Sequence, residues 1–167
     1  MILTSYKECL DKISESKLKR LKTIINDYHN IIILGNGGSN AISCHIAEDY
    51  TKTLGKKALC FGDSARLSCY ANDYGWDMAY VKFLEHMQVD TNYLVILISS
   101  SGNSINILNC ALYCSHNNIP MITLSGFGDS NKLNSLYSNV SKLSFCIDST
   151  DYGTVECIHE LILHSVI

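Results

Sequence analysis

The sequence predicts an α/β fold, a three-layer sandwich in which a mostly parallel five-stranded sheet lies between helices, as in flavodoxin-like and Rossmann-like domains. Short apolar runs that are typical of buried parallel strands alternate with longer stretches whose apolar residues have helical spacing. Two turns rich in Gly and Ser follow apolar runs, where such sheets bind ligands. The 167 residues, 47% of them hydrophobic, suffice for a single domain over 1–167.

The first half of the chain begins with an amphipathic pattern that predicts one helix over 6–27. The apolar residues on or near one face of that helix are Leu10, Ile13, Leu18, Leu21 and Ile25. The elements expected after it are a strand over 30–34, a helix over 39–53 with Ser39 as its N-cap, a strand over 57–61, and helices over 64–70 and 76–86. The composition of residues 71–75 is typical of a turn.

The second half continues the alternation. The expected elements are strands over 93–98, 121–125 and 142–147, a helix over 104–115, and a last helix from 153 to the C-terminus. Asn117 and Asn118 end the helix over 104–115 ahead of Pro120. We expect residues 126–138 to form a loop with one helical turn.

The charge and cysteine content exclude several classes of protein. The net charge is −3 and the only arginines are Arg20 and Arg66, which argues against a nucleic-acid surface. The eight cysteines, of which Cys60 and Cys146 lie in apolar strand patterns, show no zinc-ribbon or C-x-x-C spacing, so we expect reduced thiols in a cytoplasmic protein. No signal peptide and no membrane-spanning segment is expected.

The two Gly/Ser turns have the same chemistry. They are Gly35-Asn36-Gly37-Gly38-Ser39 and Ser99-Ser100-Ser101-Gly102-Asn103-Ser104. Each places glycines, hydroxyls and free backbone N–H groups at a predicted helix N-terminus, where an anion is favoured. Two such turns in one small domain predict a ligand that carries a phosphate. No nucleotide cofactor is expected, because Asn40 stands where a dinucleotide fingerprint needs glycine and no Gly-Lys-Ser/Thr follows either turn.

Two helices carry imidazole and carboxylate groups at helical spacing. His45 and Asp49 are four residues apart on the helix after the first turn, and such a pair can bind a metal or move protons. A simple ion pair is the alternative. The last helix carries Glu156, His159, Glu160 and His164, for which a charged solvent face is the alternative. Spacing favours Glu160 over Glu156 as a partner of His164, because eight residues span about 12 Å of helix.

Together these motifs resemble the sugar isomerase (SIS) family and, within it, the phosphoheptose isomerases. The resemblance covers most of the chain and rests on four segments in the family's order. They are Gly35–Ser39 with His45–Asp49, Asn72–Gly75, Ile98–Ser104, and Glu156–His159 running to His164. It implies a homotetramer with active sites at subunit interfaces, in which the N-terminal helix over 6–27 would pack. It also implies isomerisation of sedoheptulose 7-phosphate to D-glycero-D-manno-heptose 7-phosphate, for bacterial heptose and surface-polysaccharide precursors.

The resemblance also implies roles for individual residues. The substrate-binding set is Asn36, Gly37, Gly38, Ser39, Asp49, Asn72, Asp73, Ser99, Ser100, Ser101, Ser104 and Glu156. Zinc, one divalent ion per active site, would be held by His45, Asp49, Glu156 and His164, so the resemblance selects Glu156 where spacing favours Glu160. The chain departs from the family by having Asp49 for its usual glutamate and Glu156 for its glutamine. Two carboxylates and two imidazoles around one point favour a divalent metal.

The expected chemistry moves a proton between C1 and C2 of the sugar through an enediol. Asp49 is the candidate base and His164 the candidate acid. Two alternatives stay open: a non-catalytic binding protein of the same fold (a sugar-phosphate sensor or a replication-initiator partner), and an isomerase for another sugar phosphate. The pocket wall that would choose the sugar is expected to include Tyr50, Lys52 and Tyr152.

Overall fold

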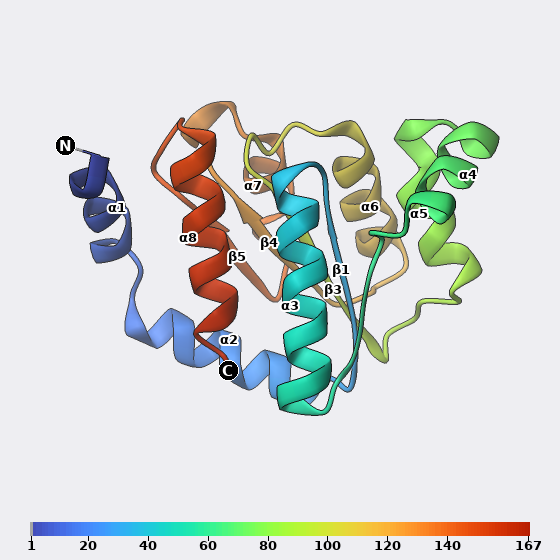
Figure 1. Ribbon diagram of the computed structural model, residues 1–167, viewed down its shortest axis with the longest axis horizontal. Coiled ribbons are helices and arrows are strands. Elements are labelled where there is room, and N and C mark those ends of the chain that lie inside the picture. The colour runs from blue at the N-terminus through green and yellow to red at the C-terminus, as the bar shows by residue number, and fades with distance from the viewer. Residues whose placement is uncertain (1) are drawn as a thin grey trace.

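The structure, a computed structural model, describes residues 2–167 and contains a five-stranded sheet in which all strands are parallel. The strands are β1 (Asn30–Gly35), β2 (Lys57–Cys60), β3 (Tyr93–Ser99), β4 (Met121–Ser125) and β5 (Leu143–Cys146), in the spatial order β2-β1-β3-β4-β5. Figure 1 shows the sheet with helices in front of it and behind it. The predicted α/β sandwich is confirmed.

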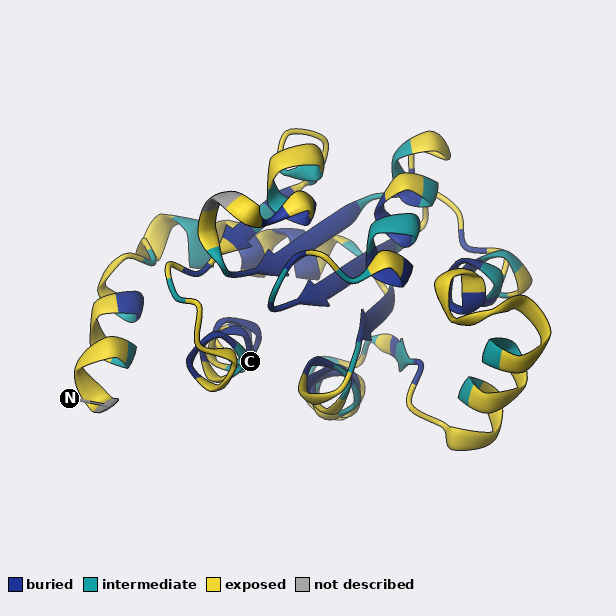
Figure 2. Cartoon of the chain, turned by 90° about the horizontal axis from the view of Figure 1, so that it is seen from above, coloured by how far each residue is buried: buried dark blue, intermediate teal, exposed yellow. Residues whose placement is uncertain are grey.

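Helices cover both faces of the sheet. They are α1 (Ile2–Asp11), α2 (Glu15–Asp27), α3 (Gly38–Leu54), α4 (Ser64–Tyr74), α5 (Trp76–His86), α6 (Ile105–His116), α7 (Lys132–Tyr137) and α8 (Tyr152–His164). Because successive strand residues point to opposite faces, Ile31 and Ile33 of β1 pack with α2, α3 and α8, whereas Ile32 and Leu34 pack with α5, α6 and α7. Figure 2 shows this buried sheet between its two helical layers.

The N-terminal amphipathic segment is two helices, not the single helix predicted over 6–27. The first helix ends at Asp11, and Ser14 begins the second as the N-cap of α2, where its hydroxyl accepts a hydrogen bond from the Lys17 N–H at 3.3 Å. The predicted apolar face is nevertheless correct. Leu21 and Ile25 are fully buried, and the remaining three members of that face pack against the same core.

Three other boundaries differ from the sequence prediction. The turn expected over 71–75 is helical up to Tyr74, and only Gly75, with φ +77°, separates α4 from α5. Ser39 is not an N-cap: Gly37, with φ +55°, takes that position, and Ser39 is buried in the first turn of α3. The loop expected over 126–138 contains a 3₁₀ turn (Gly128–Ser130) in addition to α7.

The cysteines divide into buried and accessible thiols. Cys9, Cys110 and Cys114 are buried, Cys44 and Cys60 are half-buried, and all eight are free. Cys146, expected inside an apolar strand pattern, is exposed at the end of β5 on an edge of the sheet. No helix within residues 2–167 combines the length and the apolarity that crossing a membrane requires.

Candidate active site

The strand order brings the two Gly/Ser turns together. β1 and β3 are neighbours at the centre of the sheet, and the chain leaves them toward opposite edges, so the turns that follow them flank the crevice at the topological switch point. A pocket of about 240 Å³ lies there. Its lining comprises Asn36, Gly37, Gly38, Ser39, Ile98, Ser99, Ser100, Ser101, Ser104, Tyr152 and Glu156.

The chemistry of this switch-point pocket suits an oxyanion. The N-termini of α3 and α6 both open toward it without a side-chain cap, which leaves backbone N–H groups for a ligand. The Ser99 hydroxyl donates to Ser104 Oγ at 3.2 Å, so the Ser104 O–H remains able to donate to a ligand. Among the described residues that line the pocket there is no lysine or arginine. An anion would therefore be held by hydroxyls and N–H groups, as the composition predicts.

The second turn is held rigidly by its neighbours. Gly102 has φ +66°, and a Cβ there would collide with the Asn131 carboxamide. The Asn103 carboxamide donates to the carbonyls of Ser101 and Ser130, at 3.0 and 2.9 Å. These contacts preorganise the serine hydroxyls before any ligand binds.

A second pocket, of about 320 Å³, continues from the first along α3 and α8. It is lined by Gly38, Ala41, Ile42, His45, Gly153, Glu156, Cys157 and Glu160. The two pockets share Gly38 and Glu156, so a ligand anchored in the first can extend into the second. The Glu156 carboxylate lies against Gly38, where any Cβ would collide with it.

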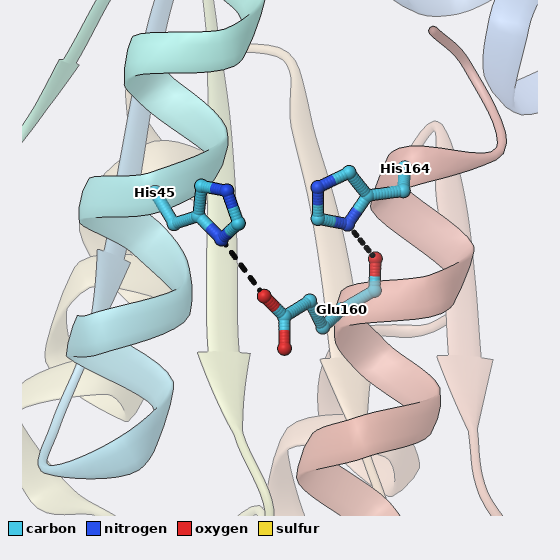
Figure 3. A group of neighbouring side chains, drawn as sticks. All are labelled: His45, Glu160 and His164. Atoms are coloured by element: carbon cyan, nitrogen blue, oxygen red, sulfur yellow. Dashed lines mark hydrogen bonds and ion pairs between the residues drawn. The ribbon is translucent and has the colours of Figure 1, made fainter.

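An imidazole–carboxylate cluster (His45, Asp49, Glu160 and His164) lies between α3 and α8, which run side by side (Figure 1). His45 and Glu160 line the second pocket, whereas Asp49 and His164 line neither of the two pockets. His45 is placed between two carboxylates, with Nε2 3.3 Å from Asp49 Oδ2 and Nδ1 2.9 Å from Glu160 Oε1. Asp49 Oδ2 also lies 3.2 Å from His164 Nε2. Figure 3 shows the two imidazoles on either side of Glu160.

The hydrogen bond at the other His164 nitrogen decides its tautomer. Nδ1 lies 3.0 Å from the backbone carbonyl of Glu160, which can only accept, so Nδ1 carries a proton (Figure 3). In the neutral ring the lone pair of Nε2 then faces the Asp49 carboxylate. Two acceptors this close need a proton or a cation between them. The cluster is therefore arranged either to carry an imidazolium or to bind a metal ion.

The structure brings together a different set of donors from the one that the resemblance implies. Ligand atoms of His45, Glu160 and His164 all lie within 4.8 Å of one another. Glu156 is not in this group, and its carboxylate lies one helical turn away, at Gly38. The spacing argument for Glu160 agrees with the geometry because residues four apart on α8 share a face.

Four other predicted contributors lie outside the pockets. Asn72 and Asp73 are exposed on α4, where the Asn72 amide donates to Asp73 at 2.9 Å, and they do not line either pocket of their own chain. Tyr50 is fully buried and donates to the Leu163 carbonyl at 2.9 Å, and Lys52 is exposed further along α3. Only Tyr152 of the expected pocket wall lines the pocket. The sequence did not point to Asn106, which pairs with Asn36.

Comparison with known proteins identifies the family. No protein-family model matches the chain. The phosphoheptose isomerase of Cytophaga hutchinsonii is 30% identical over 145 residues, which cover 82% of this chain and 72% of that protein. The chain belongs to the phosphoheptose isomerase family. A phosphoheptose isomerase from Fusobacterium nucleatum is 29% identical over 161 residues, covering 93% of this chain and 80% of that protein.

Solved structures agree on the fold. Phosphoheptose isomerase GmhA from Neisseria gonorrhoeae matches with a TM-score of 0.87 at 21% identity, over 98% of this chain and 89% of that one. The NanR protein of Vibrio vulnificus, solved in complex with ManNAc-6P, matches less well, with a TM-score of 0.69 at 17% identity over 98% of this chain and 56% of that one. The sugar isomerase fold expected from the motifs is thus confirmed, together with membership of the phosphoheptose isomerase family.

Proposed function

We propose that this chain interconverts sedoheptulose 7-phosphate and D-glycero-D-manno-heptose 7-phosphate, as part of the synthesis of heptose precursors for bacterial surface polysaccharides. The relatives named phosphoheptose isomerase support the reaction. The observation that carries the proposal is the Asp49–His164 pair, in which Asp49 contacts His45 of the second pocket, and that pocket continues into the hydroxyl-lined switch-point pocket. One pocket offers an anchor for a phosphate and the other offers acid–base groups.

The reaction requires a proton to move between C1 and C2 of the sugar. In the direction from ketose to aldose, the base removes a proton from C1, and the electron pair forms the C1–C2 double bond of an enediol. The same proton is then delivered to C2, while protons exchange between the two oxygens. We assign the carbon-bound proton to Asp49 and the oxygens to His164, whose ring orientation is fixed by the Glu160 carbonyl. The phosphate, remote from these atoms, anchors and orients the substrate.

A divalent metal fits the imidazole–carboxylate cluster. Ligand atoms of His45, Glu160 and His164 lie within 4.8 Å of one another, and three protein ligands leave the open fourth position of a catalytic zinc site. Asp49 is outside that group: His45 directs Nε2 toward Asp49 and Nδ1 toward Glu160, so one ion on one nitrogen of that ring does not meet both carboxylates. We therefore propose His45, Glu160 and His164 as the zinc ligands within one chain. When bound, zinc would polarise the substrate carbonyl and stabilise the enediolate.

A second copy of the chain is proposed to complete the site in a homotetramer. α4 has no buried residue within the described chain, and Tyr74, Trp76 and Met78 are exposed close to Asn72 and Asp73. An exposed apolar group of this kind is typical of a protein interface. The two polar residues of α4 would then reach a neighbouring subunit's pocket. Light scattering tests the proposal, since a chain that stays monomeric at micromolar concentration contradicts it.

The buried thiols support a cytoplasmic location. Cys110 and Cys114 lie one turn apart in the core and are free. Free, buried cysteines are typical of proteins that work in a reducing compartment.

The experiment that tests the function is a substrate panel with product identification. Purified protein is incubated with sedoheptulose 7-phosphate and with pentose and hexose phosphates, and the products are identified by NMR. Conversion of the heptulose phosphate with the largest kcat/KM is expected. Binding of sugar phosphates without turnover would instead show a non-catalytic binding protein, and preference for a shorter sugar would show an isomerase of different specificity.

A further inference from the structure

Asn36 and Asn106 form a reciprocal pair of amide hydrogen bonds. Asn36 Nδ2 donates to Asn106 Oδ1 at 2.8 Å, and Asn106 Nδ2 donates to Asn36 Oδ1 at 2.9 Å. Asn36 follows β1 and lines the switch-point pocket, whereas Asn106 is in the first turn of α6 and is 1% exposed. The pair therefore joins the two sides of the crevice.

A third hydrogen bond fixes the orientation of both amides. The backbone N–H of Ile107 donates to Asn106 Oδ1 at 3.0 Å. Because that N–H can only donate, the oxygen of Asn106 cannot exchange places with its nitrogen without leaving two donors face to face. The fixed Asn106 amide in turn dictates which end of the Asn36 amide faces which partner. A chain of hydrogen bonds therefore runs from the backbone of α6 through Asn106 to the Asn36 side chain in the pocket.

This chain of hydrogen bonds leaves Asn36 with a known number of free donors and acceptors. A carboxamide has two N–H donors and two acceptor positions, and Asn106 takes one of each. One N–H and one lone pair of Asn36 remain for a ligand. In a pocket whose described lining has no cationic side chain, this neutral donor of fixed direction is available to phosphate or hydroxyl oxygens of a ligand.

We propose that Asn106 is a positioning residue for sugar-phosphate binding, which acts by orienting the Asn36 amide and by holding the β1 and β3 turns at a fixed separation. The inference rests on the proposed function for its substrate. Asn106 itself is covered and touches the ligand only through Asn36. Its loss would weaken ground-state and transition-state binding alike, because the phosphate end of the substrate does not change during the reaction.

A double-mutant cycle tests this proposal. Asn36→Ala, Asn106→Ala and the double variant are compared with wild type by steady-state kinetics, and the Kd for sedoheptulose 7-phosphate is measured by calorimetry. Each single substitution is expected to raise KM and Kd about tenfold while kcat changes less than about threefold. The double variant is expected to bind no more weakly than Asn36→Ala alone, since Asn106 acts through Asn36.

Asn106→Asp provides a variant of the same size in case the alanine variant does not fold. One carboxylate oxygen then faces Asn36 Oδ1 in place of an N–H, so the same rise in KM is expected. The matched control is Asn109→Asp on the same helix, where the amide donates to the Asp77 carbonyl outside both pockets and normal kinetics are expected.

The outcomes separate the two proposals. Additive losses in the double variant, or an unchanged KM and Kd in a folded Asn106→Asp variant, overturn the positioning role alone. Binding without turnover by the wild type overturns the isomerase function alone, and the Kd values still report the coupling. A wild type that binds no sugar phosphate overturns both.

Discussion

His164 Nε2 lies 3.2 Å from Asp49 Oδ2, although 115 residues separate the two along the chain. The contact exists because α3 and α8 cover the same face of the sheet and run side by side (Figure 1). It places an acid–base pair on two helices, and the hydrogen bond from His164 Nδ1 to the backbone carbonyl of Glu160 orients the ring.

Asp49→Asn is expected to lower kcat for sedoheptulose 7-phosphate by about 10²-fold or more, because an amide cannot accept the carbon-bound proton. The matched control is Glu48→Gln, which changes the same charge at the adjacent exposed position. Steady-state turnover is the measurement. Activity within about threefold of wild type in Asp49→Asn would show that the base is another group.

Glu160→Gln is expected to weaken zinc binding at least about tenfold, since loss of even an outer-shell partner of a metal ligand costs about that much. Glu156→Gln should leave zinc affinity nearly unchanged, because the Glu156 carboxylate lies at Gly38 outside the cluster. Zinc titration by calorimetry and elemental analysis after dialysis provide the readout. The reverse result, with zinc lost from the Glu156 variant, would support the ligand set that the family resemblance implies.

Ser104→Ala is expected to raise KM about tenfold or more with little change in kcat, because a hydrogen bond to a charged phosphate contributes about 1.5–3 kcal/mol. Stability should change little, as the Ser104 side chain does not cap α6. Ser135→Ala, at an exposed position on α7, serves as the control. Unchanged KM in Ser104→Ala would place the phosphate elsewhere.

His159 is expected to make the protein less stable in mild acid. Burial of the enclosed ring lowers the pKa of its imidazole from 6.5 to about 4, and the hydrogen bond that Nε2 donates to the Ser125 carbonyl at 3.0 Å only partly opposes this shift. The unfolded chain binds the proton more readily, so stability is complete above about pH 6.5 and is lost as pH falls toward 4.

The size of the His159 effect follows from the two pKa values. Between about pH 7.5 and about pH 5 the free energy of unfolding should fall by about 2 kcal/mol from this group. Urea denaturation of wild type and His159→Gln at both values measures it, because the other titrating groups are common to both proteins. An equal loss in the two proteins would mean that His159 is already protonated in the fold.

The sequence predicted strands and helices best where the pattern of apolar residues matches the side chains that the fold buries. The five strands were predicted because short continuous apolar runs such as 94–98 are typical of strands that are covered on both faces. The break at Ser14 was missed because the apolar face continues across it and hides the cap. Residues 71–74 look like a turn by composition, yet the helix continues because Gly75 supplies the reversal by itself.

Side-chain partners were harder to predict than elements. The choice between Glu156 and Glu160 needed the relative positions of α3 and α8, which the sequence of either helix alone does not contain. Asn106 could not be found because its partner is 70 residues away, on the other side of the crevice. Its only signal is an amide among the apolar residues of the first turns of α6.

Helix α8 spans the whole length of the site, from Glu156 at the phosphate end to His164 at the acid–base end. Those residues are eight positions apart, which corresponds to a rise of about 12 Å along the helix. Helix α8 therefore fixes the distance that the carbon chain of the sugar must span between the two ends of the site. A single residue inserted between them would rotate His164 about the helix axis by about 100° and move its ring away from Asp49.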